Sequence, residues 1–218
     1  VVDEHGDLGE RNDVVLVGLN HKLGMRATTN TALAIGDGTY SPGGKKGAIG
    51  YLVGAPGDGL RQMFHMMNAA RTEIGIMSAA VGFAGYAVSL DYAKSRRQGR
   101  HRTTSGKDAA RPQVPIVEHA DVKRMLLAQK AFSEGSVALG LYAGRLLDEQ
   151  KTGTPESAES ARRLLEILTP VVKSFPSEWC LESNSLAIQV LGGAGYTRDF
   201  MVEKYWRDQR LNMIHEGT

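Results

Sequence analysis

The chain has 218 residues, of which 42% are hydrophobic, and its formal net charge is +2. This length and apolar content predict one large or two small globular domains with a sizeable core, and they exclude a disordered chain. Because the basic residues are scattered among 24 acidic ones rather than gathered in a stripe, we expect no nucleic-acid partner.

The apolar runs are short and are broken by glycine or charge, so the sequence predicts no integral membrane segment. No basic and apolar leader opens the sequence, which favours a cytoplasmic location, or an organelle matrix. The single cysteine, Cys180, excludes an intramolecular disulfide, and its apolar neighbours predict a buried, inert thiol.

Residues 1–56 contain short β-prone runs separated by Gly, Asp, Asn and Pro turn signals. The expected strands are Val14–Gly18, Thr31–Ile35 and Ala48–Val53. Three or four short strands would leave unpaired sheet edges. We therefore interpret residues 1–56 as part of a middle β domain whose sheet is incomplete here.

From Asp58 onward, apolar residues recur at helical spacing, and no proline interrupts them before Pro112. This pattern predicts one helix of roughly 40 residues, which is a length typical of helix bundles. Small residues within it, such as Ala79, Gly82 and Gly85, would let another helix approach closely.

A polar, turn-rich stretch at residues 99–116 predicts a mobile loop. A second long helix is expected from Glu118 to Gln150. A third helix, capped by Thr154 with Pro155 in its first turn, should run to about Lys173 and be bent or interrupted near Pro170.

A fourth helix is expected from Pro176 to Leu191 and should end at the glycines of Gly192–Gly195. A last helix or pair of turns should lie between Val202 and Met213. The predicted fold is therefore mainly α: a partial β-strand domain, residues 1–56, followed by a C-terminal four-helix bundle of long antiparallel helices, residues 57–218.

Several generic site motifs fail on spacing or context. The Gly38–Lys46 loop resembles a phosphate loop, but its lysine is one place late and a proline interrupts it. The glycines at 192–195 follow a helix rather than a strand, which excludes a dinucleotide fold of the Rossmann type. The six histidines lack the spacing of metal ligands, so no metal is expected.

Five separated segments, in order and spacing, resemble the acyl-CoA dehydrogenases. The segments are Lys22–Thr28, Arg71–Ile74, Tyr92–Gln98, Gln189–Tyr196, and Tyr205–Arg210 continued to Glu216–Thr218. The run Met63–Arg71, the insertion around residues 99–112 and the run Pro112–His119 further resemble the larger bacterial branch of methylmercaptopropionyl-CoA and broad-range fatty acyl-CoA dehydrogenases.

This resemblance implies α,β-dehydrogenation of an acyl-CoA thioester, with FAD as hydride acceptor and an electron-transfer flavoprotein as the oxidant of the flavin. A lone glutamate near a chain end is ordinarily a solvated surface group. In its Glu-Gly-Thr context, however, Glu216 is similar to the base that removes the α-proton. Gly217 would let the backbone pass close to flavin and thioester, and Thr218 resembles a flavin contact; the alternative for these two residues is an ordinary helix stop.

The resemblance matches Arg71, with Asn68 one turn earlier, to the region that positions the thioester end of the substrate. The alternative is a salt bridge within the bundle, from Arg71 to an acid such as Glu73 or Asp208.

Arg96 is matched to the arginine that reaches the FAD pyrophosphate of a neighbouring subunit, a role that Arg97 could exchange with it. Gln189, Gly192 and Gly193 resemble the segment that lies along the adenosine diphosphate half of FAD; the alternative is a plain helix C-cap. Where family members often carry Phe-Gly, this chain has Gln98 and Gly99, which puts one aromatic flavin contact in doubt. A flavin shared across subunits requires a homo-oligomer, a dimer or tetramer.

Family members begin with a helical domain and continue past Glu-Gly-Thr, so the 218 residues resemble an internal fragment that we expect to be inactive alone and to bind FAD weakly or not at all. Two other classes stay open. One is a catalytically silent binding protein like the alkylation-response proteins that share this scaffold and contact DNA. The other is an acyl-CoA oxidase or flavin monooxygenase.

Overall fold

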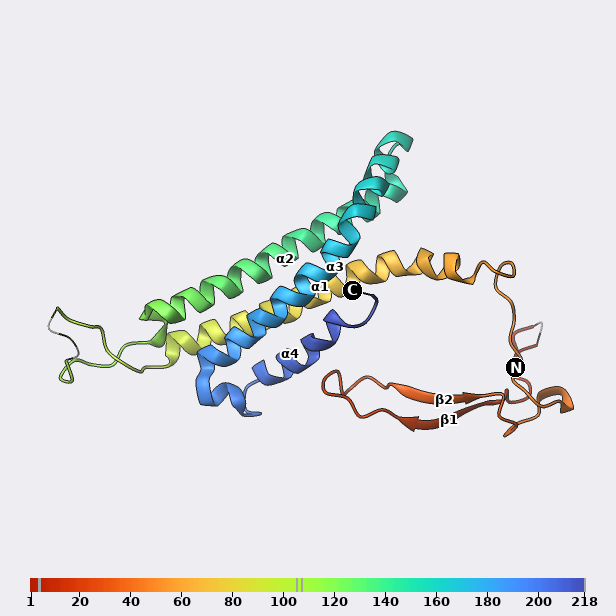
Figure 1. Cartoon of the computed structure of the whole chain (residues 1–218), viewed down its shortest axis with the longest axis horizontal. Coiled ribbons are helices and arrows are strands. Elements are labelled where there is room, and N and C mark those ends of the chain that lie inside the picture. The colour runs from red at the N-terminus through yellow and green to blue at the C-terminus, as the bar shows by residue number, and fades with distance from the viewer. Residues whose placement is uncertain (4, 105, 107, 218) are drawn as a thin grey trace. The chain divides into compact units, whose positions relative to one another are not determined.

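The structure is a computed structural model that describes residues 1–3, 5–104, 106 and 108–217, without the side chain of His65. It divides into two compact units, Val1–Met63 and Phe64–Thr218, which are considered separately (Figure 1).

The first unit contains an antiparallel pair of strands, β1 (Val14–Leu19) and β2 (Thr31–Ile35), followed by a short 3-10 turn, η1 (Pro42–Gly44). Val14 pairs with Ile35, and the register shifts between Leu16 and Gly18. Apolar side chains on both strands are more than half exposed, as at Val17 and Ile35. A two-stranded ribbon is at best marginally stable alone, and the interpretation of these residues as part of a larger β domain stays a prediction.

The third expected strand, Ala48–Val53, is wrong: these residues form no strand in the structure. Asn12 explains the difference, because its side-chain amide bonds both backbone groups of Ile49. Asn12 Nδ2 donates to the Ile49 carbonyl at 2.8 Å, and the Ile49 N–H donates to Asn12 Oδ1 at 2.8 Å. An asparagine thus replaces the strand partner that the β-prone composition of this run suggests.

The second unit is helical, which confirms the mainly α fold class. The described residues form four α-helices, of which three are long and the fourth has eight residues. The elements, in order, are α1 (Gly59–Ser95), η2 (Ile116–Glu118), α2 (Ala120–Thr152), α3 (Pro155–Leu191), η3 (Gly192–Tyr196), α4 (Val202–Gln209) and η4 (Arg210–Met213). In Figure 1, α2 runs opposite to α1 and α3, and α4 returns along the bundle.

Small residues bring α1 against α3. A Cβ added at Gly82 would lie 2.6 Å from Cys180 Cβ, and one at Gly85 would overlap the Asn184 side chain. Ser78 Oγ lies 3.5 Å from Ser177 Oγ in the same row. The buried face of α1 is therefore the stripe of small residues rather than its bulky apolar ones, and Cys180 is buried as predicted.

The third and fourth helices expected from the sequence are in fact one helix, α3, with Pro170 and Pro176 inside it. Proline lacks the N–H that would bond the carbonyl four residues earlier, so Pro176 leaves the Val172 carbonyl without its helical donor. Gly75 of α1 packs against that carbonyl so closely that a Cβ there would overlap it. Tertiary packing thus carries the helix through a residue that normally ends one.

The ends of α3 are as predicted. Thr154 Oγ1 accepts from the Ser157 N–H at 3.3 Å, with Pro155 in the first turn. Gly192 ends the helix with φ +60°, and its N–H bonds the Gln189 and Ile188 carbonyls. An apolar cluster that includes Leu191, Val190, Met125 and Val202 packs beneath this end of the bundle.

Helix α1 contradicts the expectation that no segment is apolar enough to span a bilayer. It contains an 18-residue window of mean hydropathy 1.4, of which 33% is buried within the chain. Length and composition alone are weak grounds for a membrane span, because the core helix of a soluble bundle meets the same criterion. Its small-residue contacts with α3 account for α1 as a bundle helix.

We expect Gly75→Ala to lower the free energy of unfolding by about 1–3 kcal/mol, because the new methyl group overlaps the Val172 carbonyl. The matched control is Gly135→Ala on α2, where an added Cβ meets nothing within 4 Å. It should stabilise by up to about 1 kcal/mol through helix propensity. Denaturant unfolding of the purified protein followed by circular dichroism measures both, and equal effects would contradict the packing described.

Candidate functional site

The last described residues fold against α1 through Arg71. Arg71 Nε donates to the Glu216 backbone carbonyl at 2.9 Å, across 145 residues of sequence. Glu216 has φ +60°, a left-handed conformation that is uncommon for a residue with a side chain. Gly217 follows with φ +78°, and a Cβ there would lie 2.8 Å from Arg71 Nη2. The contact thus holds a strained turn that presents the glutamate.

This geometry brings together three predicted residues, Arg71, Glu216 and Gly217. In the described part of the chain, Arg71 forms no ion pair with Glu73 or Asp208, so the alternative of a salt bridge to either acid is not what the structure shows. Thr218 lies outside the described residues, so its predicted flavin contact stays a prediction.

Asn68 does not join this group. It lines a groove between α1 and α2 together with Glu73 and Ile76, whereas Arg71 lies on the side of α1 that meets the terminal turn. Its predicted place beside the substrate thioester therefore stays a prediction that the Arg71 contact does not support.

Two residues near the terminal turn were missed by the sequence reading. Lys173, on α3, is 2% exposed, and His215 is half-buried; both have side-chain nitrogens with no hydrogen-bond partner among the described residues. Burial lowers the pKa of the His215 imidazole, while Glu216 raises it and Lys173 lowers it. Lys173 could have been noticed, because it shares a helical face with Thr169, Pro176 and Cys180, all of which are buried.

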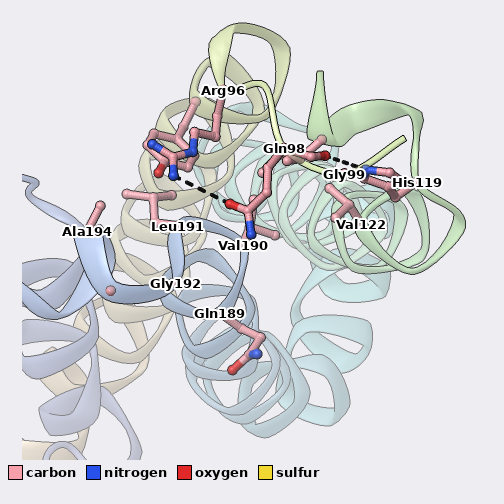
Figure 2. A pocket seen from close by; sticks show the side chains of 13 residues that line it. Arg96, Gln98, Gly99, His119, Val122, Gln189, Val190, Leu191, Gly192 and Ala194 are labelled. Carbon is pink, nitrogen blue, oxygen red and sulfur yellow. Dashed lines mark hydrogen bonds between the residues drawn. The ribbon is translucent and has the colours of Figure 1, made fainter. Parts of the chain in front are cut away.

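A second group of predicted residues forms one pocket. Arg96, Gln189, Gly192 and Gly193 line a pocket of about 630 Å³ between the ends of α1 and α3 and the start of α2 (Figure 2). Residues more than 90 positions apart in sequence therefore share one cavity, and their contact with a flavin stays a prediction.

The same pocket contains residues that the sequence reading did not select. Tyr92, Gln98 and His119 also line it; Arg96 Nη2 donates to Gln98 Oε1 at 3.4 Å, and His119 Nε2 lies 2.7 Å from the Gln98 carbonyl (Figure 2). Gln98 stands where family members often carry an aromatic residue, and here it orients the arginine instead. Arg97 does not line the pocket; its Nη1 donates to the Gln113 carbonyl at 3.1 Å.

The charges of this pocket suit a phosphate, but not for the reason expected. The Gly192 N–H is used to cap α3, and the C-terminal end of a helix carries a negative partial charge, so the glycine turn does not offer the positive helix end. The α2 N-terminus, which begins after His119, supplies that end, and Arg96 supplies the full charge. An arginine, a glutamine amide and a helix N-terminus fit the adenosine diphosphate half of FAD.

Comparisons with known proteins match the whole of this chain. Residues 57–218 match the family model described as the C-terminal domain of acyl-CoA dehydrogenase. The 3-methylmercaptopropionyl-CoA dehydrogenase of Ruegeria pomeroyi is 38% identical over 215 residues, which are 99% of this chain and 34% of the relative. The broad-specificity linear acyl-CoA dehydrogenase FadE5 of Mycobacterium tuberculosis is 35% identical, over 99% of this chain and 34% of its own length.

Solved structures share the fold at lower identity. Butyryl-CoA dehydrogenase from Megasphaera elsdenii superposes with a TM-score of 0.72 and 18% identity, covering 94% of this chain and 45% of that one. Caenorhabditis elegans ACDH-11 in complex with C11-CoA superposes with a TM-score of 0.77 and 24% identity, covering 100% of this chain and 32% of that one. This chain spans about a third of the length of these curated relatives. It belongs to the acyl-CoA dehydrogenase family, and its residues 57–218 match the C-terminal domain.

Proposed function

We propose that the protein dehydrogenates an acyl-CoA thioester to the 2-enoyl-CoA, with Glu216 as the base that removes the α-proton. The observation that carries the proposal is the contact of Arg71 with the Glu216 carbonyl, at 2.9 Å, in a chain that matches this family. It gives a carboxylate a fixed backbone in a partly buried turn, and fixed placement is what proton transfer from a weak carbon acid needs.

The residues around Glu216 have different roles in the proposed proton transfer. Arg71 holds the turn through its hydrogen bond, and Gly217, which has no side chain, lets the Arg71 guanidinium approach the turn closely. In this proposal the backbone at Gly217 also passes close to the thioester. In this proposal the Glu216 N–H donates to the thioester oxygen as charge develops on it, and the carboxylate takes the proton. Bound FAD would supply the acceptor for the hydride that leaves the β-carbon.

The pocket at Arg96 supports a homo-oligomer. Arg71 and Arg96 are separated by 25 residues along and just beyond α1, so they lie about 37 Å apart at the rise of a helix. A stretched FAD molecule is shorter than that. We therefore propose that Arg96, Gln189, Gly192 and Gly193 hold the FAD of a neighbouring subunit, which requires a dimer or tetramer.

We further propose an electron-transfer flavoprotein as the electron acceptor and the cytoplasm as the location. The relatives matched are named for different acyl-CoA substrates, one linear and one sulfur-containing, so the substrate class proposed here is an acyl-CoA thioester in general. On their own, the 218 residues should bind FAD weakly or not at all, because the pocket that they supply fits one half of the cofactor.

Glu216→Gln should slow flavin reduction by about 100- to 10,000-fold, because the amide keeps the size of the side chain but cannot accept the proton. The measurement is anaerobic bleaching of flavin absorbance in the full-length protein by a panel of acyl-CoAs. Absence of bleaching by any thioester in the unsubstituted protein would contradict the proposal and favour the binding-protein alternative.

Arg96→Ala should weaken FAD affinity roughly 10- to 100-fold, because a charge-assisted hydrogen bond is lost. Arg97→Ala is the matched control, since Arg97 bonds the Gln113 carbonyl and does not line the pocket. Equilibrium dialysis of the full-length protein against FAD measures both affinities. An equal loss of FAD affinity in the two variants would show that Arg96 is not part of the cofactor site.

A further inference from the structure

Lys173 is the largest of the fully buried side chains among the described residues. Its Nζ is buried and has no hydrogen-bond partner in the part of the chain that the structure describes. An uncompensated buried ammonium is strongly unfavourable, so a cation kept in such a place needs a compensating charge. The proposed reaction gives this residue no role.

Packing places Lys173 in the same layer as Arg71. The neighbouring residue Val172 meets Gly75 of α1, and Arg71 lies one turn before Gly75 on the same helix. Contacts further along, such as Ser78 with Ser177, show that α1 and α3 keep this register. Lys173 therefore approaches the Arg71 end of α1 from the opposite helix.

The terminal segment is anchored to the same turn of α3. Gln209 Nε2 donates to the Pro176 carbonyl at 3.3 Å, and Asn212 Nδ2 donates to Gln209 Oε1 at 3.3 Å. These two bonds hold the segment that leads to Glu216 one turn away from Lys173. Arg71 holds its end through the Glu216 carbonyl.

The charged and titratable groups that act on Lys173 come from two elements. Burial lowers the pKa of its ammonium, Arg71 of α1 lowers it further, and the Glu216 carboxylate raises it. Lys173 in turn lowers the pKa of His215. Glu216 is thus the carboxylate that favours a charged Lys173.

We infer that Lys173 is a positioning residue for Glu216: its buried ammonium attracts the Glu216 carboxylate and holds it in one position, in the turn fixed by Arg71. The inference rests on the proposed role of Glu216 and deepens it. Lys173 acts through Glu216 and not on the substrate, because its own side chain is buried. The inference is based on three observations: the buried Lys173 Nζ without a hydrogen-bond partner, its position in the same layer as Arg71, and the anchored terminal segment.

The test uses the full-length protein with FAD bound and compares Lys173→Met, Lys173→Gln and Lys173→Arg. Flavin reduction is followed anaerobically over a range of acyl-CoA concentrations. In the Met and Gln variants the maximal rate should fall by roughly 10- to 100-fold, because the carboxylate loses the opposite charge that holds it in place. Substrate affinity should change less than about twofold, as expected of a group that acts only through another. Lys173→Arg keeps the charge and should keep the rate close to that of the unsubstituted protein.

Lys204→Met, an exposed lysine on α4, is the control and should match the unsubstituted protein. Lys173→Met should fold, because an apolar residue of similar size replaces a buried charge. An independent readout is thermal unfolding: Glu216→Gln should lower the midpoint by about 2–4 °C when Lys173 is present and leave it unchanged in the Lys173→Met background.

An unchanged maximal rate in both neutral variants, or an equal effect of Glu216→Gln in the two backgrounds, would overturn the positioning role. Failure of the proposed function itself has a different signature. In that case Glu216→Gln would still reduce its flavin at the normal rate, whatever the Lys173 variants do.

Discussion

The close approach of α1 to α3 is the constraint on which the candidate site depends. It requires glycine at Gly75 and a carbonyl at Val172 that Pro176 has freed from its helical bond. A bulkier residue at either helix would separate the two and move Arg71 away from the turn of α3 that anchors the terminal segment. The position of Glu216 therefore depends on the packing of small residues between α1 and α3, because that packing places Arg71, which bonds the Glu216 carbonyl.

Helix α1 also separates two chemistries. Arg71, in its first half, holds the glutamate turn, and Arg96, just beyond its end, lines the phosphate-suited pocket. In the proposed function these two groups lie too far apart along the helix for the base and the pocket of one subunit to serve the same flavin. Assembly into an oligomer is then part of the proposed chemistry rather than an addition to it.

Much of this organisation could be predicted from sequence, where the signals are local. Helical spacing predicted α1 and α2 to within two residues at most ends, and β1 and β2 follow from their short β-prone runs. The failures have distant causes: Asn12 takes the backbone of Ile49 out of a strand, and contacts from α1 carry α3 through Pro176. Likewise Arg96 and its pocket partners could be selected by motif, whereas Lys173 carries no motif and is exceptional only because tertiary packing buries it.

The central claim is that Glu216 removes the α-proton, and hydrogen exchange at the substrate tests it without requiring flavin reduction. The full-length protein would be incubated in deuterium oxide with a thioester that cannot be oxidised, and deuterium at the α-carbon would be followed by mass spectrometry. The account predicts exchange in the unsubstituted protein and exchange reduced to the uncatalysed rate in Glu216→Gln. Undiminished exchange in that variant would contradict it and assign the proton to another base.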